Sequence, residues 1–357
     1  MKILSTKDLL NLVDGAAIFS AGGGGAPEEG YKIVQELEKE GHMVKLADPM
    51  EIPDQALIVN FACVGATAST GYNSQAAVKA LKTLQEYVGR EFYAVIPIEL
   101  GGLNTLVAAD VAARLEIPLV DADGAGRAVP EVHLKVYTID NIPLVPMVIS
   151  DINAKNIVIV KETSNFKSAE RIARVLASEW NQLAYTARRI LTGKQVKTSP
   201  IQHSLSKAMH VGKILHESSN PIDAILTELK GFKIFEGTVT KVERKTSEGF
   251  TWTRIIVNGE KAYKGKILEL KAKNEILAAY INEKLAAIAP DIITPIDTKT
   301  GKCVTAEKIA EKHSLTVIGL RAPEKWRTEK GLKLWQEVLE KAEIHEKYVP
   351  IEHIHKC

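Results

Sequence analysis

Two short segments carry polar side chains of the kinds that catalyse or bind. The first, DADGAGRAVPE, places four of them within eleven residues: Asp121, Asp123, Arg127 and Glu131. Two carboxylates can act as a general base or hold a metal ion, and an arginine beside them can orient the carbonyl or acidic group of a substrate. The same pattern also suits a turn that is merely braced, with Arg127 paired to one of the acids. The segment is therefore interpreted either as a catalytic group or as a structural turn.

The second segment, ELGGLN, contributes Glu99 and Asn104. Each segment follows a short apolar run, residues 92–98 for the second and residues 117–120 for the first, and such runs are typical of buried parallel strands. Open α/β sheets bind ligands at the carboxyl ends of their strands, where neighbouring loops lie side by side. We therefore expect Glu99 and Asn104 to bind a substrate next to the carboxylate pair.

Cys63 follows a third apolar run, residues 56–61, and so lies at a third strand end. A buried, inert thiol is the commoner state of a lone cysteine, and a thiolate that ligates a metal or attacks a substrate is the alternative. The nine histidines show no HExxH or similar zinc pattern. The candidate metal ligands are therefore Cys63, Asp121 and Asp123.

Four consecutive glycines, residues 22–25, precede a predicted helix that begins near Pro27. Their backbone could approach a phosphate or a carboxylate closely. The spacing does not match the dinucleotide fingerprint, no Walker lysine follows, and Glu28 and Glu29 would repel an anion at that helix end. We expect a structural or substrate-shaping loop, with the backbone of Gly23, Gly24 and Gly25 near the substrate, and no nucleotide cofactor.

The elements that would position these residues alternate between strand and helix in the first half of the chain. Apolar residues at helical spacing predict helices, and short apolar or β-branched runs predict strands. The first helix is capped by Ser5 or Thr6. The other predicted helices are residues 28–40, 74–88 and 104–115, and the predicted strands are residues 15–20, 44–46, 56–61, 92–98, 119–120, 142–149 and 156–160. This order predicts a Rossmann-like α/β domain with a parallel sheet.

The pattern changes in the second half. A long helix is predicted over residues 168–192, and β-branched and aromatic runs then predict hairpins, with turns at Glu248-Gly249 and Asn258-Gly259. A helix over residues 277–289 and strands over residues 291–296 and 315–320 follow. We place the boundary near Asn165, which gives an N-terminal α/β domain, residues 1–165, and a C-terminal α+β domain, residues 166–357.

Composition limits the class of protein. The 357 residues favour two domains, and a net charge of +2, from 46 basic and 44 acidic residues, argues against a nucleic-acid or membrane partner. Three unclustered cysteines suit a reducing compartment. The chain shows neither a signal-peptide pattern nor an apolar run long enough to span a membrane. We expect a cytoplasmic protein that acts on a small molecule and forms a homo-oligomer.

The order of the motifs resembles the S-methyl thiohydantoin desulfurase family, which includes many hydantoinase-related proteins of unknown function. The resemblance covers nearly the whole chain and rests on GAAIFSAGGGGAP from Gly15, PIELGGLN from Pro97, VDADGAGRAVPE from Val120, Lys273-Asn274-Glu275 and PDII from Pro290. It implies an α/β N-terminal domain and a C-terminal domain that contains a β-rich swivelling module. It also implies a zinc-associated hydrolysis that displaces a methylthio group from a hydantoin-like ring.

Two departures from the family pattern lie near the expected pocket. Residues 63–73, CVGATASTGYN, stand where the family has a Gly-Ala-Pro loop followed by an acidic, lysine-containing segment, and Val129 stands where the family has an aromatic residue. The same fold is therefore expected to accept another ring of this class.

Together these patterns predict a metal-assisted hydrolase of a small cyclic amide, imide or amidine, with zinc or another divalent metal as cofactor. A metal-bound water would attack the ring carbon, a carboxylate of Asp121, Asp123 or Glu131 would handle its proton, and Arg127 or Asn104 would stabilise the developing charge. The alternative is a noncatalytic small-molecule-binding or regulatory subunit of a hydantoinase-type enzyme, in which the same loops recognise a ligand.

Overall fold

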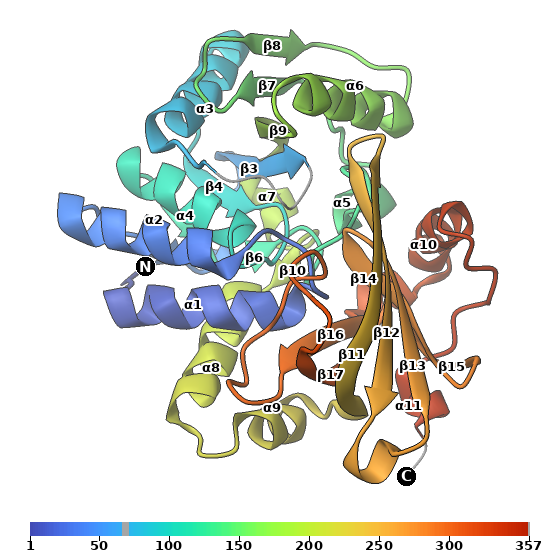
Figure 1. Ribbon diagram of the computed structural model, residues 1–357. Helices are drawn as coiled ribbons and strands as arrows, with labels where there is room; N and C mark the ends of the chain where they lie inside the picture. Colours follow the sequence, from blue (N-terminus) through green and yellow to red (C-terminus); the bar gives the residue numbers. More distant parts are fainter. Residues whose placement is uncertain (66–70, 356–357) are drawn as a thin grey trace.

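The computed structural model describes residues 1–65 and 71–355. Residues 66–70, which belong to the predicted loop after Cys63, and the terminal Cys357 lie outside the described residues. Two large sheets, which we call sheet A and sheet C, form the framework on which the helices are arranged (Figure 1). The structure confirms the predicted α/β class in its coarse form, a mixed α/β fold with a sheet that contains parallel strands.

Sheet A has eight strands in the order β1-β2-β5-β4-β3-β9-β7-β8. Strands β2, β5, β4 and β3 run parallel, as predicted, whereas β1, β9, β7 and β8 pair antiparallel, which makes the sheet mixed. The bounds are β1 (Lys2–Ile3), β2 (Lys45–Ala47), β3 (Leu57–Gly65), β4 (Ala94–Pro97), β5 (Leu119–Val120), β7 (Met147–Asp151), β8 (Ile157–Val160) and β9 (Leu183–Thr192).

Sheet C has seven antiparallel strands in the order β15-β14-β13-β12-β11-β17-β16, and it curls beside sheet A (Figure 1). The bounds are β11 (Phe232–Ser247), β12 (Phe250–Gly259), β13 (Ile267–Lys273), β14 (Glu275–Ile281), β15 (Lys284–Ile288), β16 (Ile292–Asp297) and β17 (Ser314–Leu320). A separate two-stranded sheet pairs β6 (Ala122–Asp123) with β10 (Ile201–Gln202). The hairpins predicted in this half are present, including the turn at Glu248-Gly249.

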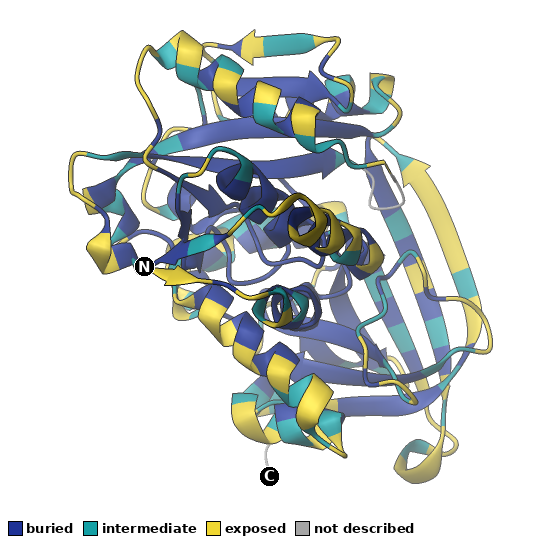
Figure 2. Ribbon diagram, turned by 90° about the vertical axis from the view of Figure 1, so that its left-hand side faces the viewer, coloured by how far each residue is buried: buried dark blue, intermediate teal, exposed yellow. Residues whose placement is uncertain are grey.

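Helices cover both faces of sheet A. One apolar core joins α1, α2, α3, α4 and α8 to one face, and smaller cores join α6 and α10 to the other. The strands are largely buried, while the outer helices show exposed stripes (Figure 2). The bounds are α1 (Thr6–Phe19), α2 (Pro27–Glu40), α3 (Ser74–Val88), α4 (Asn104–Arg114), α5 (Val136–Ile139), α6 (Phe166–Glu179), α7 (Gly193–Val196), α8 (Ser204–Glu217), α9 (Pro221–Leu229), α10 (Glu329–Lys341) and α11 (Ile351–Ile354), with 3₁₀ turns η1 (Pro49–Glu51), η2 (Lys261–Tyr263) and η3 (Glu324–Arg327).

The first predicted strand is wrong, because residues 15–19 are the end of helix α1. Ser5 caps this helix through a reciprocal capping box with Asp8, and the helix continues through Gly15. A Cβ at Gly15 would lie 1.7 Å from the carbonyl oxygen of Ala208 on α8. The glycine is therefore required for close contact between two helices.

Two predicted helices are also wrong. The segment 168–192 divides into α6 and the strand β9, and the chain reverses through Asn181 and Gln182, which have φ of 55° and 66°. The segment 277–289 forms most of the β14–β15 hairpin, whose turn residues Asn282 and Glu283 have φ of 46° and 65°. In both segments an apolar, alanine-rich stretch fits either periodicity, and strand pairing within a sheet decides the outcome.

Among the described residues, no helix combines the length and apolar character that a membrane crossing would require.

Candidate functional site

Glu99 is the centre of a buried hydrogen-bond network just beyond strand β4. Its Oε1 accepts a hydrogen bond from the side-chain amide of Asn104 at 2.7 Å, and its Oε2 accepts one from the ammonium of Lys135 at 3.0 Å. The side-chain oxygen of Asn104 accepts the backbone N–H of Cys63 at 3.0 Å. Because β3 and β4 are parallel neighbours, their ends bring Cys63, Glu99 and Asn104 together.

These side chains line a buried cavity of about 50 Å³. The wall also includes Gly24 and Gly25, three cationic side chains and the Asn274-Glu275 pair; the cations are Lys135, Arg174 and Arg188. Sheet A supplies the strand-end residues, and the tip of the β13–β14 hairpin of sheet C supplies Glu275. The cavity therefore lies where the two sheets meet.

Asn274 fixes the hairpin tip that delivers Glu275. It is the single residue between β13 and β14, with φ of 60°, and it exchanges two hydrogen bonds with Thr251: its N–H donates to the Thr251 carbonyl at 2.8 Å, and its side-chain oxygen accepts the Thr251 N–H at 2.9 Å. Asparagine tolerates this left-handed conformation better than most residues. The turn thus sets the position of the next carboxylate.

Glu275 is the most perturbed acid of the cavity. Burial, reinforced by the charge of Glu99, raises the pKa of Glu275 to about 8, although Arg127 and Lys135 act in the opposite direction. Its Oε2 is buried and has no hydrogen-bond partner within residues 1–65 and 71–355. A carboxyl group in such a site is protonated at neutral pH and can donate a proton.

Lys135 and Arg188 provide positive charge to the same cavity. Burial lowers the pKa of Lys135, against the attraction of Glu99, and burial likewise lowers the pKa of Arg188 to about 10. Arg188 lies at an irregularity in the pairing of β3 with β9, where Arg189 takes a φ of 48°. Such a bulge changes the direction of side chains in a strand, and here Arg188 faces the cavity.

The glycine loop shapes one wall. The carbonyl of Gly24 accepts the N–H of Asn104 at 3.1 Å, and the carbonyl of Gly22 accepts the N–H of Ala306 at 2.8 Å. A Cβ at Gly23 would lie 2.1 Å from Oε1 of Glu275. The loop therefore joins the start of α4 to the second half of the chain and leaves room for Glu275.

The carboxylates of Asp121 and Asp123 do not line this cavity. Asp121 accepts hydrogen bonds from the N–H and the hydroxyl of Ser206, at 2.9 and 2.5 Å, and so caps helix α8. Asp123 Oδ2 accepts the N–H groups of Ala125 and Gly126 at 2.8 and 2.7 Å. Asp121 thus caps a helix and Asp123 stabilises its own turn, but among the described residues neither acid forms the ion pair with Arg127 that the braced-turn alternative expected.

Arg127 is fully buried and braces the same turn against sheet C. Its Nη1 donates to the carbonyls of Pro290 and Asp291 at 2.6 and 3.0 Å, and its guanidinium lies 4.7 Å from the ring centre of Trp335. It does not line the cavity, although its charge lowers the pKa of Glu275.

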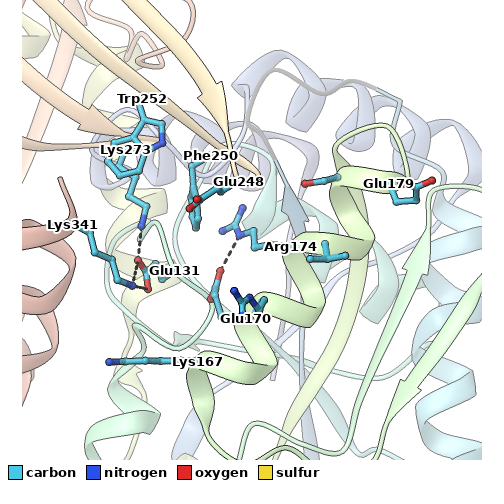
Figure 3. Close-up of a pocket in the computed structure, with 13 residues that line it drawn as sticks. Glu131, Lys167, Glu170, Arg174, Glu179, Glu248, Phe250, Trp252, Lys273 and Lys341 are labelled. Atoms are coloured by element: carbon cyan, nitrogen blue, oxygen red, sulfur yellow. Dashed lines mark hydrogen bonds and ion pairs between the residues drawn. The ribbon is translucent and has the colours of Figure 1, made fainter.

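Glu131 lies between the cavity and an open cleft of about 790 Å³ that lies between α6 and the β11–β12 hairpin (Figure 3). Its carboxylate pairs with Lys273 and, at 3.1 Å, with Lys341. Burial would raise the pKa of Glu131, but the charge and hydrogen bond of Lys273 hold this pKa below its usual value. The aromatic rings of Phe250 and Trp252 face the same cleft.

Arg174 also lines both the cavity and the cleft. Its guanidinium donates to the carbonyls of Gly65 and Gly249, both at 3.0 Å, and of Pro130 at 2.7 Å, and it pairs with Glu170 at 2.9 Å. One side chain thus connects the end of β3, the loop before Glu131, helix α6 and the tip of the β11–β12 hairpin.

The predicted zinc or other divalent ion does not have a matching donor set in the described part of the chain. Residues 1–65 and 71–355 contain no group of three or more His, Cys, Asp or Glu side chains that could hold a metal ion. Of the candidate ligands, Asp121 and Asp123 bind backbone N–H groups, and burial raises the pKa of the Cys63 thiol to about 12.

The sequence interpretation missed several residues of the cavity wall. Arg188 was hidden by the wrong helix over residues 168–192, although two adjacent arginines in the run LAYTARRILT are an unusual feature of a buried strand. Lys135 and Arg174 had no motif to mark them. Glu275 was visible only in the Lys273-Asn274-Glu275 motif of the family resemblance.

Comparison with known proteins agrees with this architecture. The N-terminal domain of the S-Me-THD-like family matches residues 7–161, and the C-terminal domain matches residues 163–337. A crystal structure of a protein from Chromobacterium violaceum, a structural-genomics target, is similar in fold, with a TM-score of 0.82 at 22% identity over 98% of this chain and 100% of the other. No protein with a curated description matches. Since the two domain matches together span most of its length, the chain belongs to the S-Me-THD-like family, that of S-methyl thiohydantoin desulfurase.

Proposed function

We propose that the chain hydrolyses a small hydantoin-like ring, a cyclic amide, imide or amidine, and that Glu275 transfers the proton. Membership of the S-Me-THD-like family supports the substrate class. The observation that carries the residue assignment is the buried carboxyl of Glu275, whose pKa is raised to about 8 and whose Oε2 has no partner among the described residues.

The chemistry of such a ring sets three demands. Water must attack an sp² ring carbon, negative charge then develops on the ring heteroatoms, and the leaving nitrogen or methylthio group must take up a proton. Protonated Glu275 would donate that proton, and its carboxylate would then take up the proton that the attacking water loses. The cations of Lys135 and Arg188 would stabilise the developing charge. Glu99 and Asn104 would orient the ring through hydrogen bonds, as the sequence predicted.

This assignment transfers the proton step from Asp121 and Asp123 to Glu275, because neither aspartate lines the cavity. Asp121 accepts the N–H and hydroxyl of Ser206, and Oδ2 of Asp123 accepts two backbone N–H groups. Glu131 stays near the site, at the boundary with the outer cleft. Zinc or another divalent ion remains a prediction of the family resemblance, and elemental analysis of the purified protein tests it.

The substrate would enter from the outer cleft. A cavity of about 50 Å³ has room for a few waters, since each needs about 10–15 Å³ of such space, and it is too small for a ring. Arg174 and Glu131 face both spaces, so the wall that they form would have to open to admit a ring. The S-methyl group or ring substituent would then face Phe250 and Trp252.

The test is hydrolysis by the purified chain of S-methyl thiohydantoin, followed as methanethiol release, and of hydantoin, followed as ring opening. Glu275→Gln should lower kcat/KM by about 10²–10⁴-fold, the usual contribution of a proton-transfer group. Glu179→Gln, which changes an acid in the outer cleft, should leave the rate unchanged. Full activity in Glu275→Gln would refute the assignment.

The alternative function, a noncatalytic binding or regulatory subunit, gives a different result in the same assay. The chain alone would then bind the ring, seen as a rise in Tm with ligand concentration, without turnover of either compound.

A further inference from the structure

A second groove, of about 620 Å³, shares no lining residue with the buried cavity. It lies where α8 and the end of α9 meet the ends of β16 and β17. Much of its lining is apolar, including Phe19, Leu229, Ile292 and Leu320. The ammonium groups of Lys207 and Lys230 belong to the same lining.

Lys207 has an unusual position for a cation. It lies in the first turn of α8, where the helix dipole favours negative charge, and that turn contains no acidic residue. The carboxylate of Asp121 caps the same helix end by accepting the N–H of Ser206, but it forms no ion pair with Lys207. Asp121 thus offsets the positive end of the helix itself, and Lys207 is a separate cation beside it.

The charge of Lys207 is also partly removed from water. Its ammonium lies 5.3 Å from the ring centre of Phe19, and burial lowers the pKa of Lys207. No carboxylate of the described residues lies within ion-pair distance; Glu228, which raises this pKa, pairs with His210 at 3.1 Å instead. Lys207 as a residue is exposed, so an incoming anion could reach its ammonium and would give it the ion-pair partner that the described residues do not supply.

The other charged side chains of the groove differ in whether they have an ion-pair partner. Arg321 pairs with Glu352 at 2.5 Å, and Lys325 pairs with Asp140 at 2.7 Å, so both are neutralised. The one acid in the lining, Glu324, is 89% exposed and lies 3.8 Å from Arg327. Lys230, the residue that ends α9 with φ of 50°, has no ion pair within residues 1–65 and 71–355.

We propose that this groove is a second ligand site that binds an organic anion with an apolar body, a carboxylate on an aliphatic or aromatic framework. The anionic group binds the ammonium of Lys207, with Lys230 adding positive potential. The apolar body lies on Phe19, Leu229, Ile292 and Leu320. This site is independent of the hydrolysis proposed for the buried cavity.

The experiment is calorimetric titration of the full chain with octanoate, 3-phenylpropionate and octanol. The two carboxylates distinguish an aliphatic from an aromatic body, and octanol has an apolar body without the charge. We expect saturable binding of at least one carboxylate at one site per chain, weaker binding of octanol, and loss of affinity as salt increases.

Lys207→Met keeps the aliphatic stem and removes the charge, so it should weaken carboxylate binding by about tenfold, or 1.4 kcal/mol. Lys39→Met, which removes an exposed charge from α2, and Glu275→Gln, which alters the other cavity, should bind as the unchanged protein does. The proposal is overturned if no carboxylate binds saturably, if octanol binds as tightly, or if Lys207→Met has no effect. Equal loss in Glu275→Gln would place the ligand in the buried cavity and would also overturn it.

Discussion

Gly23 and Glu275 are 252 residues apart in sequence and in direct contact: a Cβ at Gly23 would lie 2.1 Å from Oε1 and 2.5 Å from the carboxyl carbon of Glu275. Gly22, Gly24 and Gly25 have φ between 67° and 79°, whereas the backbone of Gly23 is not left-handed. Gly23 is therefore required for space and not for its backbone conformation. The contact makes the glycine loop part of the cavity that holds the perturbed acid.

Gly23→Ala should accordingly displace the Glu275 carboxyl and lower kcat/KM of the proposed hydrolysis by at least about tenfold, equivalent to 1.36 kcal/mol of barrier. Steady-state kinetics with either ring substrate measure the effect. Gly41→Ala is the matched control: Gly41 has φ of 74°, and a Cβ there would meet nothing within 4 Å, so it should cost about 1 kcal/mol of stability with no loss of rate. Equal rates in both variants would show that the Gly23–Glu275 contact does not matter to turnover.

Glu275→Gln should change how stability depends on pH. The pKa of Glu275 is raised from 4.5 to about 8 in the folded protein, so the unfolded chain loses its proton first as pH rises. The folded protein is therefore penalised progressively between about pH 4.5 and pH 8, and the penalty is constant above that range. Urea unfolding at several pH values should show Glu275→Gln gaining stability relative to the unchanged chain as pH rises through this range. A pH-independent difference would contradict the raised pKa.

Arg174→Gln should destabilise the fold by about 3–5 kcal/mol, because it breaks the ion pair of buried Glu170 and removes three bonds to backbone carbonyls. Burial would raise the pKa of Glu170, but Arg174 and His133 lower this pKa to about 2. The stabilisation by ionised Glu170 is thus complete above about pH 4.5 and is lost as pH falls toward 2.

Urea unfolding across this acid range tests both parts of that prediction. The unchanged chain should lose stability more steeply than Arg174→Gln as pH falls. Arg171→Gln, on the exposed face of the same helix, should stay within about 0.5 kcal/mol of the unchanged chain. A similar small effect at Arg174 would show that the four contacts are not needed to hold the hairpin.

Asp123 offers a direct test between the two interpretations of the DADGAGR segment. Its Oδ2 accepts two N–H groups, and burial raises the pKa of Asp123 to about 6. Asp123→Asn keeps an acceptor oxygen and should retain turnover, whereas Asp123→Ala should lose about 1–3 kcal/mol of stability, the cost of unpaired N–H groups. Turnover lost in Asp123→Asn without loss of stability would restore this acid to the catalytic group.

The strand ends of the first half could be predicted because they depend on local apolar runs. The motifs predict that Glu99 and Asn104 lie next to the carboxylate pair, whereas in the structure Asn104 contacts Glu99 and Cys63, near the end of β3. Asp121 and Asp123 follow the same rule of strand ends, yet neither lines the cavity. Asp121 accepts hydrogen bonds from Ser206, and Oδ2 of Asp123 accepts two N–H groups of its own turn. Spacing cannot show whether a nearby donor already occupies an acid.

The missing half of the site depends on contacts that are far apart in sequence. Arg188 reaches the cavity only because β9 pairs with β3. Glu275 reaches it because the β13–β14 hairpin lies next to the carboxyl ends of β3 and β4. In both regions the sequence fits a helix as well as a strand. The residues of β3 that pair with β9 are more than 100 positions away in the sequence. Local pattern alone therefore could not reveal the cations or the perturbed acid.

Cys63 provides the last test, of the thiol at the end of β3. Burial, with the charge of Glu99, raises the pKa of Cys63 to about 12, so the thiol stays protonated at neutral pH, and a protonated thiol is a poor nucleophile and metal ligand. Iodoacetamide should therefore label Cys63 slowly in the native chain and rapidly in urea, as read by peptide mass spectrometry. Cys63→Ala should keep kcat/KM within about threefold, less than 1 kcal/mol of barrier.

Cys303, whose pKa burial also raises to about 12, is the reference thiol outside the cavity. Fast native labelling of Cys63 alone, with loss of turnover in Cys63→Ala, would instead make this thiol a nucleophile or a ligand.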